Sequence, residues 1–179
     1  MKNSMRVAFC GVIAALSTVL FLLTGVVPVA TIALPAIAGC LLIPVVVEVG
    51  LPWAFGVYGV CCVLGLLFAP DREALLFYLL FFGYYPALFA VVGRIRSRVL
   101  RYGVKLLVLN VAVVLEVLLS VYALGIPLET LSILGPAGPV VLWVLANVVF
   151  VVYDLALEGL IVQYLNRVHD RLGKLLRGK

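Results

Sequence analysis

The sequence predicts an all-α integral membrane protein, a bundle of six transmembrane helices with both termini in the cytoplasm. Hydrophobic residues make up 66% of the 179 residues and charged residues only 12%, whereas soluble domains have roughly half and a quarter. A crossing needs about 20 apolar residues, so six crossings occupy nearly the whole chain as a single transmembrane domain. The apolar runs lack period-two alternation, which favours helices over barrel strands, because lipid satisfies no backbone polar group.

Prolines, glycines and charged clusters divide the chain into its spans. The basic start MKNSMR resembles the opening of a signal peptide, but the apolar run that follows has no clean cleavage site, so we expect a retained first helix. After the last span, apolar residues recur at helical spacing in a basic tail, which we expect to lie along the membrane surface. The predicted spans are residues 5–27, 31–49, 53–69, 74–92, 105–124 and 140–165, and the tail is 166–179.

The positions of Lys and Arg predict the orientation of the bundle, because basic residues near span ends tend to stay in the cytoplasm. With the amino terminus inside, every one of the 13 Lys and Arg residues except Arg72 falls on the cytoplasmic side. Adding or deleting a span would separate the basic loop GRIRSRVLR from the basic tail. The net charge of +5 is thus explained by topology, and we expect no nucleic-acid partner.

The four cysteines lie inside apolar runs without C-x-x-C spacing, so we expect small packing residues and not a metal or redox site. No cofactor is predicted. The cysteines are Cys10, Cys40, Cys61 and Cys62.

Ionisable residues inside apolar spans are costly and usually face the protein interior or a wet cavity. Glu48, at the inner end of the second span, suits an interfacial carboxylate paired with a loop arginine. Asn147, Asp154 and Glu158 share one face of the sixth helix, which we expect to look into the bundle. Whether this face binds a ligand or pairs with Lys105 or the basic loop stays open.

A second group of polar residues is expected near the outer side. Glu116 lies roughly 12 Å deep at 1.5 Å per residue and needs a polar partner, for which Arg72 and a ligand amine are the candidates. Asp71 and Glu73 also suit a solvated turn with acids at a helix start, so two interpretations remain. The residues predicted to bind a solute are Asp71, Arg72, Glu73, Glu116, Tyr122, Glu129, Trp143 and Asn147.

The first helix carries a ridge of small residues, Ala8, Gly11, Ala15 and Thr18. Helices approach closely over such ridges in lipid, so the ridge is either a partner surface or packs within the bundle. In the fourth span, the run from Phe81 to Pro86 predicts a kinked, tightly packed end with interfacial tyrosines, with an aromatic stacking platform as the alternative.

The basic start leading into RVAFCGVIAALS, the six spans, the inside termini and the polar outer connections together resemble the substrate-binding S components of energy-coupling factor (ECF) transporters. The resemblance implies that the bundle binds a vitamin, metal or other micronutrient near the outer face of the plasma membrane. It also implies that the first-helix ridge docks on a transmembrane coupling subunit driven by two ATPase subunits. In the family the ridge favours alanine at every fourth position, whereas the spacing here is mixed.

Capture of a solute requires no catalytic side chain, and the acidic excess near the outer side favours a zwitterionic or amine-bearing ligand. The competing hypothesis is a non-enzymatic scaffold, similar to the six-helix subunit of the cell-elongation machinery. An intramembrane enzyme is disfavoured, since the chain has no H-E-x-x-H and the single His169 lies in the tail.

Overall fold

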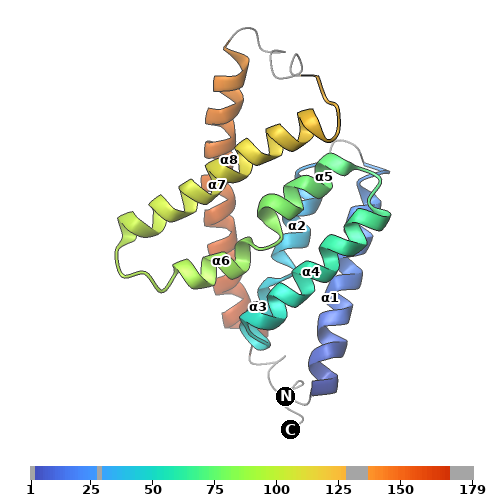
Figure 1. Cartoon of the computed structure of the whole chain (residues 1–179). Helices are drawn as coiled ribbons and strands as arrows, with labels where there is room; N and C mark the ends of the chain where they lie inside the picture. The colour runs from blue at the N-terminus through green and yellow to red at the C-terminus, as the bar shows by residue number, and fades with distance from the viewer. Residues whose placement is uncertain (1–2, 28–29, 128–136, 170–179) are drawn as a thin grey trace. The chain divides into compact units, whose positions relative to one another are not determined.

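The structure is a computed structural model that describes residues 3–27, 30–127 and 137–169, and these ranges contain helices and no strands. The all-helical prediction is therefore confirmed for this part of the chain. The helices, with η marking π-helical turns, are α1 (Asn3–Leu23), α2 (Ala33–Cys40), α3 (Ile43–Glu48), α4 (Leu51–Phe68), α5 (Arg72–Phe77), η2 (Tyr78–Phe82), α6 (Tyr85–Val92), α7 (Arg98–Tyr122), α8 (Gly138–Tyr164) and η4 (Leu165–His169) (Figure 1).

Five helical segments within the described ranges are long and apolar enough to cross a membrane. They are Asn3–Leu23, Leu51–Phe68, Arg72–Val92, Arg98–Tyr122 and Gly138–His169.

The segment predicted as the span 31–49 contains the shorter apolar segment Ala33–Glu48, in which two helices, α2 and α3, follow one another. Pro44 stands in the first turn of α3, where it has no N–H to donate and its ring would clash with the carbonyl of Cys40 in a continuous helix. The backbone N–H of Leu42 donates to the carbonyl of Gly39 at 3.0 Å instead, which closes α2 with a tighter turn.

The chain folds into two compact units. The first unit comprises Met1–Val91 and Leu157–Lys179, and the second comprises Val92–Ala156.

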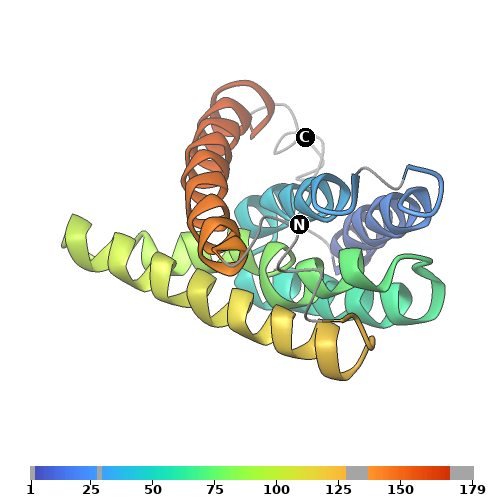
Figure 2. The same cartoon turned by 90° about the horizontal axis from the view of Figure 1, so that it is seen from above.

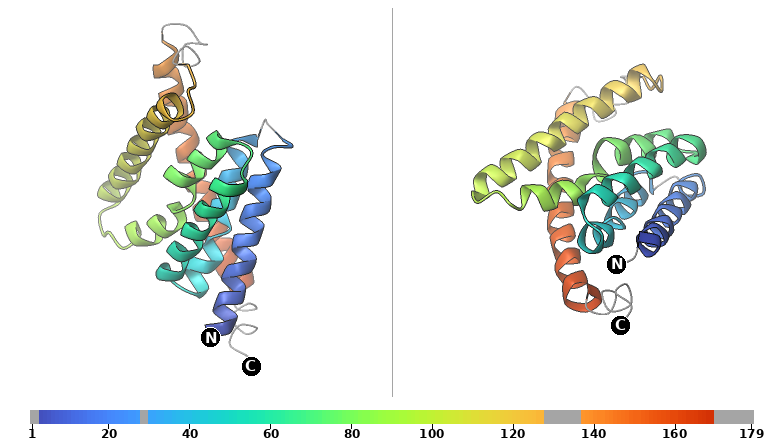
Figure 3. Two further views of the ribbon diagram at one scale, coloured as in Figure 1. Left: turned by 45° about the vertical axis from the view of Figure 1, so that its right-hand side comes forward. Right: turned by 60° about the horizontal axis from the view of Figure 1, so that its bottom comes forward.

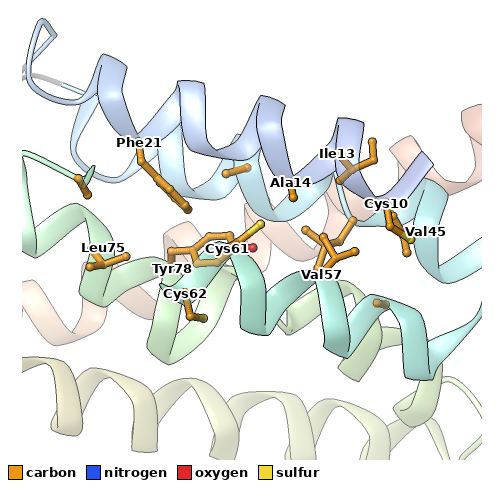
Figure 4. Close-up of a cluster of buried hydrophobic side chains, with 14 residues drawn as sticks. Cys10, Ile13, Ala14, Phe21, Val45, Val57, Cys61, Cys62, Leu75 and Tyr78 are labelled. Carbon is orange, nitrogen blue, oxygen red and sulfur yellow. The ribbon is translucent and has the colours of Figure 1, made fainter. Parts of the chain in front are cut away.

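In the first unit, α1 packs along α4 and α2, as Figures 2 and 3 show from two further directions. The buried face of α1 presents Cys10, Ile13, Ala14, Ser17 and Phe21 at helical spacing. Of these, the apolar side chains meet others from α2, α3, α4, α5 and η2 in one apolar core (Figure 4). Its members include Cys10, Cys61, Cys62, Val45, Val57, Leu75 and Tyr78.

The start of α4 and the start of α5 follow from local sequence. Gly50, with φ of 106°, adopts the left-handed region that glycine tolerates best, and Pro52 follows in the first turn of α4. The Asp71 carboxylate accepts a hydrogen bond at 3.1 Å from the backbone N–H of Ala74 and so caps α5. Both boundaries lie near their predicted positions.

The fourth predicted span bends where expected, because a π-helical turn and then Gly83 and Tyr84 interrupt it before α6. A Cβ atom on Gly83 would lie 2.7 Å from the ring atoms of Tyr58 and Tyr78, which explains the glycine. Tyr85, one of the tyrosines of this run, packs inside the protein. This residue is fully buried, and its ring lies 4.7 Å from that of Phe81.

In the second unit, α7 begins at Arg98, earlier than the predicted span at 105. Ser97 Oγ accepts a hydrogen bond from the N–H of Leu100 at 3.4 Å and starts the helix within the basic loop. The helix therefore continues past the apolar run that defines the span.

We expect Gly39→Ala to lower the free energy of unfolding by about 1–3 kcal/mol. An added Cβ would collide with the backbone carbonyl of Phe82, which cannot rotate away. Gly59→Ala in α4 is the matched control, because the space around Gly59 is open and alanine favours a helix. Thermal unfolding of the purified protein in detergent measures both, and equal Tm values for the two variants would contradict this packing.

Candidate functional site

The acidic and basic residues before α5 form a bonded turn in the first unit. Besides capping α5, the Asp71 carboxylate accepts a hydrogen bond from Thr31 Oγ1 at 2.9 Å. Arg72 is exposed, and its Nη1 donates to the carbonyl of Leu66 at 2.6 Å. Glu73 is half-buried in the first turn of α5. These contacts correspond to the interpretation of the segment as a turn and helix start.

Glu116 and Tyr122, the other predicted site residues of α7, have different surroundings. Glu116 is half-buried and accepts a hydrogen bond at 2.9 Å from Ser120 Oγ, one turn further along the same helix. Tyr122 is 83% exposed. Arg72, the partner considered from the sequence, belongs to the first unit. Glu129 lies outside the described residues.

Trp143 and Asn147 come together in the second unit, around an amide that sequence reasoning missed. The indole Nε1 of Trp143 donates to Asn110 Oδ1 at 2.6 Å, and Asn110 Nδ2 donates to Asn147 Oδ1 at 3.3 Å. Asn147 Nδ2 in turn donates to the carbonyl of Trp143 at 2.9 Å. The signal for Asn110 is its position as the one amide within the apolar run of the fifth predicted span.

An ion pair lies near this network, between Lys105 of α7 and Asp154 of α8. Lys105 Nζ lies 2.7 and 2.8 Å from the two carboxylate oxygens, and both side chains are 3% exposed. The ammonium also lies 5.5 Å from the ring centroid of Tyr102. The sequence left open whether the face of Asp154 binds a ligand or pairs with Lys105 or the basic loop. In the structure, Asp154 pairs with Lys105.

Glu158 does not share the burial of Asp154, so the expectation that both acids face the interior is wrong. The buried positions of this part of α8 are Phe150, Asp154 and Leu157. These three residues follow one another by four and then three positions, whereas Glu158 lies four positions after Asp154. Glu158 consequently lies at the edge of this buried stripe and is exposed.

In the first unit, Glu48 is bound by the end of α8 and not by a loop arginine, as the sequence had suggested. Its carboxylate, 5% exposed, accepts a hydrogen bond from Tyr164 Oη at 3.0 Å and lies 2.7 Å from His169 Nδ1. The partners are 116 and 121 positions away in the chain, and no local pattern connects them.

The cysteines fulfil the packing role predicted for them in the first-unit core, which contains Cys10, Cys61 and Cys62. Cys40 is half-buried in α2. Within the described residues, no group of three or more His, Cys, Asp or Glu side chains is placed to hold a metal ion.

The small residues of α1 lie outside its buried stripe, with Thr18 at the edge of the stripe. Ala8, Gly11 and Ala15 are exposed, and a Cβ atom built on Gly11 would meet nothing within 4 Å. Thr18 is half-buried and donates to the carbonyl of Ala14 at 2.9 Å. No described residue packs against the ridge around Gly11. The structure therefore does not show the alternative in which the ridge packs within the bundle.

We expect Lys105→Met to destabilise the protein by about 3 kcal/mol, because it leaves the Asp154 carboxylate buried without its cation. The double variant Lys105→Met with Asp154→Leu should recover most of this loss, since no charge then remains buried. Glu158→Gln, at an exposed site on the same helix, is the control and should leave Tm unchanged. A double variant as unstable as the sum of Lys105→Met and Asp154→Leu measured singly would contradict the pairing.

Comparison with known proteins adds no relative to these observations. The scan against protein-family models and the searches of curated proteins and of solved structures find no match to this chain.

Proposed function

We propose that this chain is the substrate-capture subunit of an ECF-type micronutrient uptake transporter, a non-enzymatic multi-pass protein of the plasma membrane. In this proposal it binds a small polar solute near the outer face. A transmembrane coupling subunit and two ATPase subunits then drive release to the cytoplasm, as the family resemblance implies.

The observation that carries the proposal is the exposed small-residue face of α1. Side chains larger than alanine would keep a partner helix at a distance, whereas Ala8, Gly11 and Ala15 leave backbone close to the surface. In lipid, where helices associate through packing, such a face is suited to a second transmembrane protein. Another face of α1 is already used by the first-unit core.

We include six membrane crossings in this proposal. Five are the long helices, and α2 and α3 together are the sixth. Residues Ala33–Glu48 would span roughly 24 Å at 1.5 Å per residue, somewhat less than the hydrocarbon thickness of about 30 Å. A broken crossing is tolerated where protein covers it. Leu42 and Ile43, at the break, are both buried. An even number of crossings would leave both termini in the cytoplasm.

A zwitterionic or amine-bearing solute is the ligand class that the acidic residues near the outer side favour. Glu116 would attract an amine, and Arg72, considered by itself, is exposed and has the planar fork that suits a carboxylate. Arg72 and Glu116 belong to different units, so the ligand is proposed from their chemistry alone.

A membrane scaffold is the second candidate, and one observation favours it. In the second unit, Trp143 and Asn147 bond to Asn110, and Asp154 bonds to Lys105. Polar groups that satisfy one another hold helices together without a ligand. A small molecule that copurifies with the protein and is identified by mass spectrometry would favour capture. A partner protein recovered without any such molecule would favour the scaffold.

We expect Gly11→Leu to abolish copurification of the coupling subunit and to reduce solute uptake by cells at least tenfold. The leucine side chain would project from the face of α1 and keep a partner helix away. Gly56→Leu is the matched control, because Gly56 is likewise an exposed helical glycine with no atom near its Cβ position. Equal copurification with both variants would remove the support that α1 gives to this function.

We expect Glu116→Gln to weaken binding of an amine-bearing solute by about tenfold, since a hydrogen bond to a charged group contributes about 1.5 kcal/mol. Titration calorimetry of the purified protein with amino-containing metabolites and with anionic vitamins measures this change. Preference for a purely anionic ligand that Glu116→Gln leaves unchanged would count against the proposed ligand class.

A further inference from the structure

We propose that the second unit binds one anionic phospholipid, with its phosphate on Arg94, Arg96 and Arg98 and an acyl chain along α7. The site has a different ligand from the proposed transport function, and it rests on the orientation of that proposal, in which the arginine loop is cytoplasmic.

The three arginines form a cation cluster that has no acidic partner among the residues that the structure describes. All three are exposed, whereas Asp154 is paired with Lys105 and Glu48 contacts His169. The Cα atoms of Arg94 and Arg98 are at most roughly 14 Å apart, from the reach of an extended chain. The positive charges of the three arginines therefore act together on an anion that lies between them.

Hydrogen bonds stabilise the loop that carries the cluster. Arg101 Nη2 donates to the carbonyl of Ile95 at 3.1 Å, and Ser97 caps the start of α7. Arg101 thus has a positioning role, and it leaves the other three guanidinium groups available for an anion. The positive end of the α7 dipole points to the same place.

Apolar side chains continue from the arginines along the same helix. Val99 is 83% exposed, and Tyr102 and Leu106 follow it at helical spacing on one stripe. Beyond them an open apolar groove of about 550 Å³ runs along α7. Its lining residues are Leu106, Leu107, Asn110, Val111, Val114 and Leu115.

Cations beside an apolar groove match a phospholipid better than free phosphate, because a free ion would leave the groove unused. The positive-inside pattern places the arginines at the cytoplasmic surface, where the membrane carries its anionic lipids. Each basic residue near such a surface contributes about fivefold in affinity. Three arginines therefore predict a preference of about 100-fold for an anionic over a zwitterionic headgroup.

Native mass spectrometry tests the site on the full chain, purified in neutral detergent and mixed with equimolar phosphatidylglycerol and phosphatidylcholine of identical acyl chains. We expect the wild type to retain phosphatidylglycerol at least tenfold over phosphatidylcholine. The variant R94Q/R96Q/R98Q should bring this ratio close to one, and R94K/R96K/R98K should keep most of it. Arg167→Gln, which removes an exposed arginine of the first unit, is the control for a general charge effect.

The groove is tested separately with Val111→Trp, which should reduce retention of both lipids while leaving their ratio unchanged. Val63→Trp, at an exposed position of α4, is its control. If R94Q/R96Q/R98Q elutes as an aggregate, the single variant Arg96→Gln takes its place, with an expected fall of about fivefold in the lipid ratio.

Three results would overturn the proposal. They are an unchanged lipid ratio in the glutamine variants, an equal loss of preference in Arg167→Gln, and displacement of phosphatidylglycerol by inorganic phosphate at millimolar concentration. The last result would identify a site for free anions and not for lipid.

Discussion

For helices that are long and apolar enough to cross a membrane, the absence of water in the hydrocarbon region is the governing physical constraint. A backbone polar group or a charge that enters lipid must find its partner within the protein. The Lys105 and Asp154 pair is the clearest example, since each side chain alone would be costly on its own helix. Together they neutralise each other at 2.7 Å and join α7 to α8 within the second unit.

The same constraint governs the irregular backbone of the first unit. The break between α2 and α3 and the turn at Gly83 interrupt helical hydrogen bonding, but the flanking residues Leu42, Phe82 and Tyr85 are buried in protein. Gly39 makes this burial possible, because its missing side chain lets α2 approach the carbonyl of Phe82. At these two interruptions the irregular backbone is therefore covered by neighbouring elements.

The two faces of α1 connect this packing to function. One face supplies Ile13, Ser17 and Phe21 to the core of the first unit, and the other leaves Gly11 and Ala15 uncovered. A soluble protein gains little by exposing glycine in a helix, where it lowers helix propensity by about 1 kcal/mol relative to alanine. In a membrane, an uncovered small-residue face is a surface for another helix, which is why partner binding is the basis of the proposed function.

The sequence by itself determined the all-helical class, the presence of helices apolar enough to cross a membrane and the packing role of the core cysteines, because these depend on composition and on the length of the apolar runs. Only the tertiary structure decided that Lys105 is the partner of Asp154, that Glu48 meets Tyr164 and His169, and that Asn110 joins Trp143. Those partners lie between 33 and 121 positions apart, and helix periodicity specifies a face without specifying which distant helix covers it.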